Sequence, residues 1–299
     1  MSRIAIPAAF DERVLRDEPM ARHTSWRVGG PADLWFTPRD VEDLSAFLRE
    51  LPAGVPVTWV GLGSNLLVRD GGIRGAVISV HGILNALDRV GTDSVRAEAG
   101  VPCARLGRQC AKWQLGPADF FAGIPGTVGG ALAMNAGAWG GETWPHVTEV
   151  ETVDRGGVRR RRAASEYRYS YRKVTPPAEG EWYLAATFRF ATRPDASTES
   201  IRALLEKRHA SQPIGDWSCG SVFTNPPGAH AAELIERAGL KGHRIGGAVV
   251  SAKHANFIIN EGQASAADLE ALVRHVQATV ERVHGVRLVP EVRVVGEAA

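Results

Sequence analysis

A glycine-rich stretch at residues 123–137 constrains the fold of this chain more than any other feature. It reads Gly-Ile-Pro-Gly-Thr-Val-Gly-Gly-Ala-Leu-Ala-Met-Asn-Ala-Gly, with five glycines in fifteen residues. Glycine costs backbone entropy and offers no side chain for packing, so an ordinary helix or strand is unfavourable here. Bare backbone can instead bring successive N–H groups close to an anion, and Pro125 fixes one φ angle within the stretch. The pattern predicts a stiff, backbone-lined cradle for a phosphate or a flat ring system.

A shorter glycine turn lies upstream, between two apolar segments; it is the first glycine turn along the chain, and residues 123–137 are the second glycine stretch. Residues 57–60 are strand-like, residues 61–65 read Gly-Leu-Gly-Ser-Asn, and residues 66–68 are strand-like again. The dinucleotide fingerprint G-x-G-x-x-G, which opens a helix, fails because Leu66 occupies the third glycine position. The chain also contains no G-x-x-x-x-G-K-[ST] phosphate loop. Either stretch alone is typical of a tight turn without a ligand, whereas two in one chain favour a bound nucleotide.

Composition narrows the class of protein. A chain of 299 residues forms two or three domains, and its 44% hydrophobic and 23% charged residues are typical of a soluble globular protein. The net charge of +2 gives no indication of nucleic-acid or membrane binding, and we interpret the basic run Arg159–Arg162 as a solvated hairpin edge. Three cysteines without zinc spacing favour a reducing compartment and no metal. The chain lacks an export signal or a membrane-spanning run, so we expect a cytoplasmic protein.

Residue periodicity predicts the following elements. Helices are expected over residues 41–51, with Asp40 as the N-cap, and over 102–115, 201–210, 231–238 and 265–284, the last with Ser265 and Asp268 as a capping pair. Strands are expected over residues 76–80, 94–99, 147–153, 157–161, 184–191, 249–259 and 286–295, and a linker over 193–198. The strands from 147 to 191 are expected to form a mostly antiparallel layer.

Taken together, the two glycine turns resemble the flavin-binding loops of the UDP-N-acetylenolpyruvoylglucosamine reductase family. That family belongs to the FAD-binding superfamily that includes vanillyl-alcohol oxidase and para-cresol methylhydroxylase. Further similarity follows in order at residues 24–30, 169–172, 220–226, 238–260 and 290–293. The two turns alone indicate only the superfamily, whereas the later motifs indicate the reductase.

The resemblance implies an α+β fold with a two-part FAD-binding region of mixed α/β layers and a C-terminal α/β substrate-binding domain. The expected divisions are residues 1–75 and 76–195 for the two FAD-binding subdomains and 196–299 for the substrate domain. Only the division near 195 is also visible in the composition, as the linker. The short interval between Arg172 and Ser221 resembles the family's shorter form, which lacks an inserted tyrosine loop.

The resemblance also implies catalytic roles for three residues. Ser221, which on its residue context alone could be a turn serine, stands where the family has its proton donor. Arg172 ends a Tyr-x-Tyr-Arg pattern that could otherwise be a solvated strand or a stacking strip for nucleic acid. It stands where the family has an active-site cation. Glu291 shares one face of a strand with Arg293 and stands at the family's active-site glutamate.

Binding roles follow in the same way. Implied substrate contacts are Asn225, Arg293, Tyr169 and His254, and many relatives carry lysine at the position of Thr224. The implied cofactor-binding residues are Gly61, Leu62, Gly63, Ser64, Asn65, Leu66, Gly123, Ile124, Pro125, Gly126, Thr127, Gly129, Gly130, Asn135, Ala136 and Gly137. No metal site is implied.

The resemblance implies an enzyme that uses FAD and NADPH to reduce an enolpyruvyl ether on a UDP-sugar to the lactyl ether, in peptidoglycan precursor synthesis. The expected partners are the UDP-sugar and NADPH, without nucleic acid, a membrane or a required oligomer. One alternative is an oxidase or dehydrogenase of the same superfamily, acting on an alcohol or lactone. It would share the glycine turns but would not need Ser221, Arg172 and Glu291. A second alternative is a non-enzymatic nucleotide-sugar binding protein.

Overall fold

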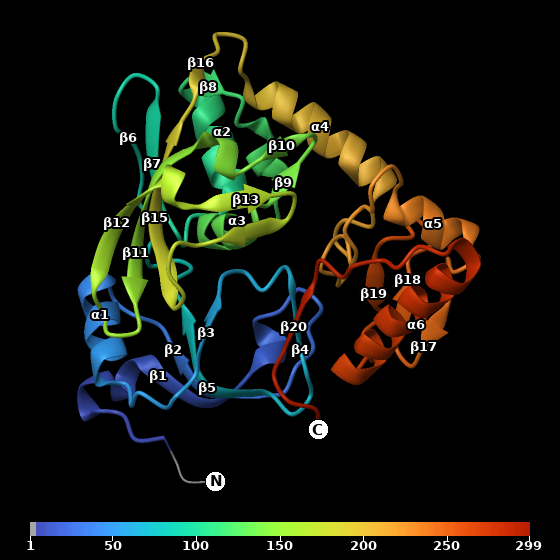
Figure 1. Cartoon of the computed structure of the whole chain (residues 1–299), viewed down its shortest axis with the longest axis horizontal. Helices are drawn as coiled ribbons and strands as arrows, with labels where there is room; N and C mark the ends of the chain where they lie inside the picture. Colours follow the sequence, from blue (N-terminus) through green and yellow to red (C-terminus); the bar gives the residue numbers. More distant parts are fainter. Residues whose placement is uncertain (1–3) are drawn as a thin grey trace. The chain divides into compact units, whose positions relative to one another are not determined.

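The computed structural model describes residues 4–299 and divides the chain into two compact units (Figure 1). The first unit comprises Met1–Leu15, Trp35–Leu62 and Ala76–Leu205, and the second comprises Arg16–Leu34, Gly63–Gly75 and Glu206–Ala299. The chain therefore passes between the units several times. One passage falls inside the first glycine turn, between Leu62 and Gly63. The division into three parts at residues 75 and 195 stays a prediction.

A five-stranded sheet with the order β12-β11-β15-β7-β6 forms the centre of the first unit. Its strands are β6 (Leu87–Arg89), β7 (Ser94–Glu98), β11 (Val147–Asp154), β12 (Arg159–Ala163) and β15 (Glu181–Arg189). Every neighbouring pair is antiparallel. The antiparallel layer predicted from the sequence is thus confirmed, and the mixture of helices and sheets confirms the predicted α+β class.

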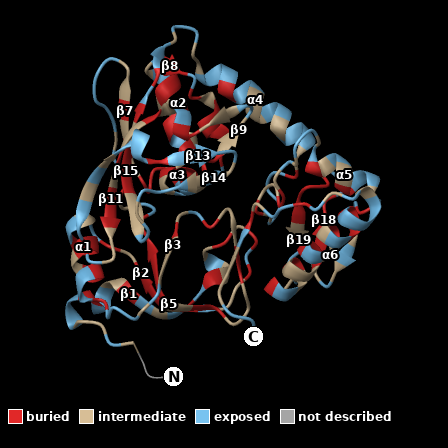
Figure 2. Ribbon diagram, in the orientation of Figure 1, coloured by how far each residue is buried: buried red, intermediate tan, exposed pale blue. Residues whose placement is uncertain are grey.

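The core of the first unit lies between this sheet and two helices, α2 (Cys103–Lys112) and α3 (Val128–Met134). Leu106 of α2 and Leu132 of α3 are fully buried in one cluster with Phe121 and Phe188. Figure 2 shows the buried residues of β11, β15, α2 and α3 in red. The small residues of the second glycine stretch, including Ala131, are part of this core, so the stretch is fixed by packing as well as by its backbone.

The remaining elements of the first unit are short. They are η1 (Ala8–Arg13), α1 (Val41–Glu50), β3 (Val57–Val60), β8 (Leu115–Gly116), η3 (Asp119–Gly123), β9 (Gly137–Ala138), β10 (Gly141–Glu142), η4 (Trp144–His146), η5 (Ala164–Glu166), β13 (Arg168–Ser170), β14 (Lys173–Thr175) and β16 (Ala191–Thr192). The side chain of Asp40 accepts from the Asp43 N–H, which confirms the predicted N-cap of α1. Four elements continue from one unit into the other: β1 (Val14–Pro19), β2 (Pro31–Phe36), β5 (Ile73–Ser79) and α4 (Thr198–Ser211).

The second unit is built on the long helix α6 (Ala266–His284). Its other elements are η2 (Met20–Arg22), β4 (Leu66–Val68), α5 (Ala231–Arg237), β17 (Arg244–Ile245), β18 (Ala248–Val250), β19 (Ile258–Asn260) and β20 (Arg293–Val295). Strands β17, β18 and β19 form an antiparallel sheet, and β20 pairs in parallel with β4. The predicted capping pair at the start of α6 is confirmed, because Ser265 accepts from the Asp268 N–H and Asp268 accepts from the Ser265 N–H.

Three predicted elements are longer than the structure shows. The strand expected over residues 249–259 is divided into β18 and β19, because the chain turns between them and the Ser251 N–H bonds the Phe257 carbonyl. The helix expected over residues 102–115 ends at Lys112, because Gln114 adopts a left-handed φ of 56° and residues 115–116 form β8 instead. The strand expected over residues 286–295 is limited to β20. The preceding residues bond elsewhere: the Leu288 carbonyl accepts from Gln277, and the Val289 carbonyl accepts from Thr224.

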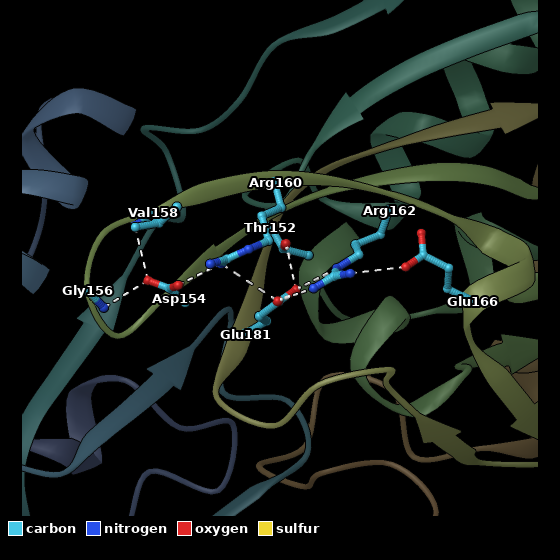
Figure 3. Close-up of polar contacts among 8 residues, drawn as sticks. All are labelled: Thr152, Asp154, Gly156, Val158, Arg160, Arg162, Glu166 and Glu181. Carbon is cyan, nitrogen blue, oxygen red and sulfur yellow. Dashed lines mark hydrogen bonds and ion pairs between the residues drawn. The ribbon is translucent and has the colours of Figure 1, made fainter.

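The basic run Arg159–Arg162 lies on β12, the edge strand of the five-stranded sheet, as predicted for a hairpin edge. Acidic side chains pair with all four arginines, and Figure 3 shows the contacts of Arg160 and Arg162. Arg160 pairs with Asp154 at 2.6 Å, and Arg162 pairs with both Glu166 and Glu181. The Glu181 carboxylate is the most buried member, and the arginines and Thr152 lower its pKa, chiefly through the hydrogen bond from Arg162. This run is therefore a structural network.

Candidate cofactor and active site

The first glycine turn and the second glycine stretch meet within the first unit. A Cβ atom added to Gly61 would lie 2.6 Å from the Thr127 hydroxyl oxygen, closer than real Cβ atoms approach. Thr127 is the N-cap of α3, and its hydroxyl accepts from the Gly130 N–H. The absence of a side chain at Gly61 is thus a condition for the contact between the two turns.

Backbone donors gather where the turns meet. Within residues 4–299, the N–H groups of Gly61, Leu62, Gly126 and Thr127 have no hydrogen-bond acceptor. Thr127 is buried, Gly61 and Gly126 are half-buried and Leu62 is exposed. An N–H without a partner in a buried or half-buried position is unfavourable, so these groups are suited to a ligand with acceptor oxygens or ring nitrogens. The Gly129 N–H, in contrast, donates to the Ala99 carbonyl at 2.9 Å. Gly129 therefore contributes shape to this site and no free donor.

The C-terminal end of the stretch is fixed by Asn135. This residue takes the left-handed conformation that ends α3, and its buried side chain bonds Glu142, the Ser170 carbonyl and the Trp144 N–H. Its own carbonyl accepts from Arg172 Nη1 at 3.3 Å, and the Gly137 carbonyl accepts from Arg172 Nη2 at 2.9 Å. Arg172 itself has a left-handed φ of 58°. The structure thus brings the predicted active-site cation onto the predicted cofactor stretch.

In the second unit, the rest of the first turn lies against the predicted catalytic strand. Asn65 Nδ2 donates to the Glu291 carbonyl at 3.0 Å, and the Asn65 carbonyl accepts from the Arg293 N–H at 3.0 Å. The Gly63 carbonyl accepts from the Ser25 N–H, and a Cβ at Gly63 would overlap the His23 carbonyl. Residues 63–65, predicted only as cofactor contacts, are therefore also part of the framework of Glu291.

Ser221 lies beside Glu291, just before β20. The prediction that Glu291 and Arg293 share one face of a strand is wrong, because the chain bends at Val292 and the strand begins only at Arg293. The Glu291 N–H donates at 2.8 Å to the carbonyl of Val222, the residue that follows Ser221. Gly220 precedes Ser221 with a left-handed φ of 80°, which turns the chain at this point. The half-buried Ser221 hydroxyl has no hydrogen-bond partner within residues 4–299, so it can donate to a ligand. The second unit thus brings Ser221, Glu291, Arg293 and Asn65 together, whereas Arg172 belongs to the first unit.

Asn256 holds the Ser221 segment in place and received no individual role in the sequence analysis. Its Oδ1 accepts from the Phe223 N–H at 3.0 Å, its Nδ2 donates to the Phe223 carbonyl at 2.8 Å, and its carbonyl accepts from the Val222 N–H. The side chain is almost fully buried. The sequence signal for this role is an asparagine directly before the apolar residues 257–259, because a buried amide needs hydrogen-bond partners.

A buried thiol lies close to Glu291. Burial, together with the negative charge of Glu291, raises the pKa of Cys219 well above its usual value. The thiol is therefore protonated at neutral pH and is a poor nucleophile. Cys219 is thus a core residue of the second unit.

The predicted substrate contacts differ in whether their polar groups already bond to the protein and in how exposed their side chains are. Asn225 Oδ1 accepts from the Ala231 N–H, which leaves its amide nitrogen to donate. Nδ1 of His254 is buried and has no partner within residues 4–299, and burial lowers the pKa of this imidazole, so it is neutral at pH 7. Tyr169, in the first unit, is exposed and stacks on Trp144 with ring centroids 5.9 Å apart. Arg293 is exposed at the start of β20.

The site in the first unit fits FAD. The N–H groups at Gly61–Leu62 and Gly126–Thr127 offer donors, and the absence of a side chain at Gly61 lets Thr127 pack against the turn so that the two pairs of donors lie together. No cluster of three or more histidine, cysteine or acidic side chains that could hold a metal occurs in residues 4–299. Over the same residues, no helix combines the length and the hydropathy needed to cross a membrane.

Comparison with known proteins identifies both halves of the chain. The family profile described as "FAD binding domain" matches residues 32–161, and the profile described as "UDP-N-acetylenolpyruvoylglucosamine reductase, C-terminal domain" matches residues 212–295. The chain is 59% identical over 282 residues to the UDP-N-acetylenolpyruvoylglucosamine reductase of Alkalilimnicola ehrlichii, covering 94% of each protein. It is 55% identical to that of Methylococcus capsulatus, covering 95% of this chain and 93% of the relative.

A solved structure agrees with these relatives. The crystal structure of UDP-N-acetylenolpyruvylglucosamine reductase from Thermus caldophilus superposes with a TM-score of 0.81 at 34% sequence identity. The match covers 94% of this chain and 98% of that one.

Proposed function

Because the chain belongs to the UDP-N-acetylenolpyruvoylglucosamine reductase family and carries its FAD-binding domain, we propose that it catalyses the NADPH-dependent reduction of UDP-N-acetylenolpyruvoylglucosamine to UDP-N-acetylmuramate. We place this step in the cytoplasm, in the synthesis of peptidoglycan precursors. The two partners of the reaction are the UDP-sugar and NADPH.

The observation that carries the proposal is the arrangement around Ser221 in the second unit. The Ser221 hydroxyl, which has no partner within residues 4–299, lies next to Glu291 at the start of the segment that leads into β20, and this segment is bonded to Asn65 of the glycine turn. An oxidase acting on an alcohol needs a base that removes a proton. Ser221 supports the opposite task, because a hydroxyl is a weak base and can donate a proton.

FAD would be held by the backbone of residues 61–66 and 123–137, and when bound it supplies the hydride-transfer chemistry that connects NADPH with the substrate double bond. The protein's own part is to hold the cofactor and substrate in register and to exclude water. The N–H groups of Gly126 and Thr127 support this role, since they are rigidly placed at the start of a packed helix.

Reduction of the enolpyruvyl group places negative charge on the carbon next to the ether oxygen and on the carboxylate, as an enolate. We assign stabilisation of that charge to Arg172, because a fixed cation at a developing charge is usually the largest electrostatic contribution to catalysis. Two backbone carbonyls, of Asn135 and Gly137, orient its guanidinium. The left-handed backbone of Arg172 is consistent with a functional constraint at this position.

Ser221 then delivers the proton to the carbanionic carbon. An alcohol is a weak acid, but a carbanion is basic enough to accept its proton at hydrogen-bond distance. Glu291 has a second role only when it is protonated, because a carboxylate would oppose the enolate charge. As a neutral acid, Glu291 donates a hydrogen bond to the enolate oxygen. Asn225 and Arg293 are assigned to binding of the UDP-sugar.

The proposal is tested by purifying the protein, identifying its flavin and following NADPH in the presence of the enolpyruvyl UDP-sugar. We expect FAD that acid precipitation releases, because neither glycine turn contains the histidine or tyrosine needed for covalent attachment. One NADPH should be consumed for each molecule of product formed. Mass spectrometry should show that the product carries two more hydrogen atoms than the UDP-sugar substrate. A protein that cannot be reconstituted with FAD, or that oxidises alcohols and leaves the UDP-sugar unchanged, would contradict the proposal.

A further inference from the structure

The residues that follow the first glycine turn are attached to the long helix of the second unit. Arg69 comes directly after β4, and its Nε and Nη2 atoms donate to the two carboxylate oxygens of Glu270, each at 2.9 Å. Its Nη1 donates to the Gly296 carbonyl at 3.2 Å. Glu270 lies in the first two turns of α6 and is only 15% exposed. A two-pronged arginine–carboxylate contact of this kind fixes direction as well as distance.

Asp70 adds a second attachment to the same helix. Its carboxylate oxygens accept from the N–H groups of Ala266 and Ala267, both at 3.0 Å. These N–H groups belong to the first turn of α6 and have no acceptor inside the helix. A negative charge is favourable at this end of a helix. Two consecutive residues therefore fasten the end of β4 to the start of α6.

This attachment reaches β20 and the preceding Glu291 through β4. Strand β4 pairs with β20 in the register Arg293–Leu66, and the Arg69 N–H donates to the Val295 carbonyl at 3.0 Å. At the other end of β4, Asn65 bonds the Glu291 carbonyl. A shift of β4 along α6 would thus move Ser64 and Asn65 relative to Glu291.

We propose that Arg69 and Glu270 are positioning residues, which hold β4 so that the Ser64–Asn65 turn stays in register with Glu291 and thereby link FAD binding to UDP-sugar binding. The inference rests on the proposed function, which assigns the turn to FAD and Glu291 to the substrate. Neither Arg69 nor Glu270 touches the reacting atoms. Because one framework then holds both binding sites, each ligand should tighten the binding of the other, and by the same factor, since linkage between two sites is reciprocal.

The test compares Arg69→Met, Glu270→Gln and the double variant with Arg274→Met as the matched control. Arg274 pairs with the same Glu270 carboxylate, but it lies one turn further along α6 and is 71% exposed. The control therefore removes an ion pair of Glu270 without releasing β4. Arg69→Lys, which keeps the charge, should recover part of any loss.

The first measurement is the Kd of FAD for the apoprotein, with and without the enolpyruvyl UDP-sugar and in the absence of NADPH. In the wild type, the sugar should tighten FAD binding by about fivefold or more. This ratio should approach one in Arg69→Met and Glu270→Gln and should be retained in Arg274→Met. In turnover, kcat of the two variants should fall by about 10- to 100-fold, the size expected for a small misplacement of reacting groups. The double variant should be no worse than the more impaired single variant, because both remove one contact.

Several results would overturn the inference. If the ratio of the Kd of FAD without the sugar to that with it, and the kcat, are the same in Arg69→Met and Glu270→Gln as in Arg274→Met, the contact is only structural. If Arg69→Met does not fold, Asp70→Asn replaces it, since it removes the charge at α6 with little change in size. Its FAD ratio should also fall, and an unchanged ratio would overturn the inference equally. A wild type that reduces the sugar but binds FAD equally with and without it refutes the link alone, whereas one that never binds FAD refutes the proposed function.

Discussion

Replacing Gly61 by alanine tests the contact between the two glycine turns. The added Cβ would lie 2.6 Å from the Thr127 hydroxyl oxygen and 3.3 Å from its methyl carbon. Thr127 cannot yield without consequence, because it is 2% exposed and its hydroxyl caps α3. We therefore expect the substitution to displace Thr127 and to disturb the Gly126–Thr127 amides at the same time.

The expected loss of stability follows from three contributions. Overfilling a packed site costs about 1–3 kcal/mol, and losing a threonine N-cap adds about 1 kcal/mol. Restricting the unfolded chain by replacing glycine with alanine returns about 0.4–1 kcal/mol. The net destabilisation should be about 1–3.5 kcal/mol, which lowers the melting temperature by several degrees. The affinity for FAD should fall as well.

The assay is thermal unfolding of the apoprotein by circular dichroism, followed by FAD titration. Gly54→Ala is the control, because no atom lies within 4 Å of the Cβ added there. It should be neutral or slightly stabilising and should leave FAD affinity unchanged. If Gly61→Ala melts at the same temperature as Gly54→Ala and binds FAD equally well, the packing of Gly61 on Thr127 is not what shapes the site.

Three further predictions concern single side chains. Ser221→Ala should leave flavin bleaching by NADPH nearly unchanged and slow the return of absorbance with the UDP-sugar by about 10²–10⁴-fold or more, as followed by stopped flow; equal slowing of both phases would contradict its role as the acid. Glu181→Gln should lower the melting temperature at pH 7, because the loss of charged hydrogen bonds should reduce the free energy of unfolding by about 2 kcal/mol. Because the pKa of Glu181 is lowered in the folded protein from about 4.5, this difference should be present above that pH and vanish as the pH falls through the folded pKa; an undiminished difference in strong acid would refute it. All three thiols should resist alkylation in the native protein, because each is buried with a raised pKa, and should react only after unfolding, as counted by mass spectrometry; rapid labelling of Cys219 in the native protein would contradict its placement in the core.

Much of the local structure was predictable because it depends on neighbours in the chain. The cap at Asp40, the capping pair at the start of α6 and the strand–turn–strand around Gly61 are set by residues a few positions apart. The errors arose where distant contacts decide. The residues before β20 bond to Thr224 and Gln277 instead of extending the strand, and no local pattern indicates those partners.

The sequence suggested which residues form the candidate site, and their roles stay predictions; how the chain brings them together was not predictable. The sequence pattern does not reveal that the chain changes unit between Leu62 and Gly63, so that one turn contributes to both halves. The attachment of Asp70 to Ala266 spans almost two hundred positions, and the signal for it, an aspartate after an apolar strand, is common in loops. Asn135 stays a predicted cofactor residue, and the sequence pattern does not reveal that its side chain joins Glu142, Ser170 and Trp144.

The central claim is that the bound flavin is reduced by NADPH and reoxidised by the enolpyruvyl UDP-sugar. The most direct measurement is the absorbance spectrum of the purified protein under argon. We expect one equivalent of NADPH to bleach the flavin, and the enolpyruvyl UDP-sugar to restore its absorbance without oxygen. If the flavin remains bleached after addition of the sugar and regains its absorbance only in air, with release of peroxide, the protein is an oxidase of the same superfamily and the account is wrong.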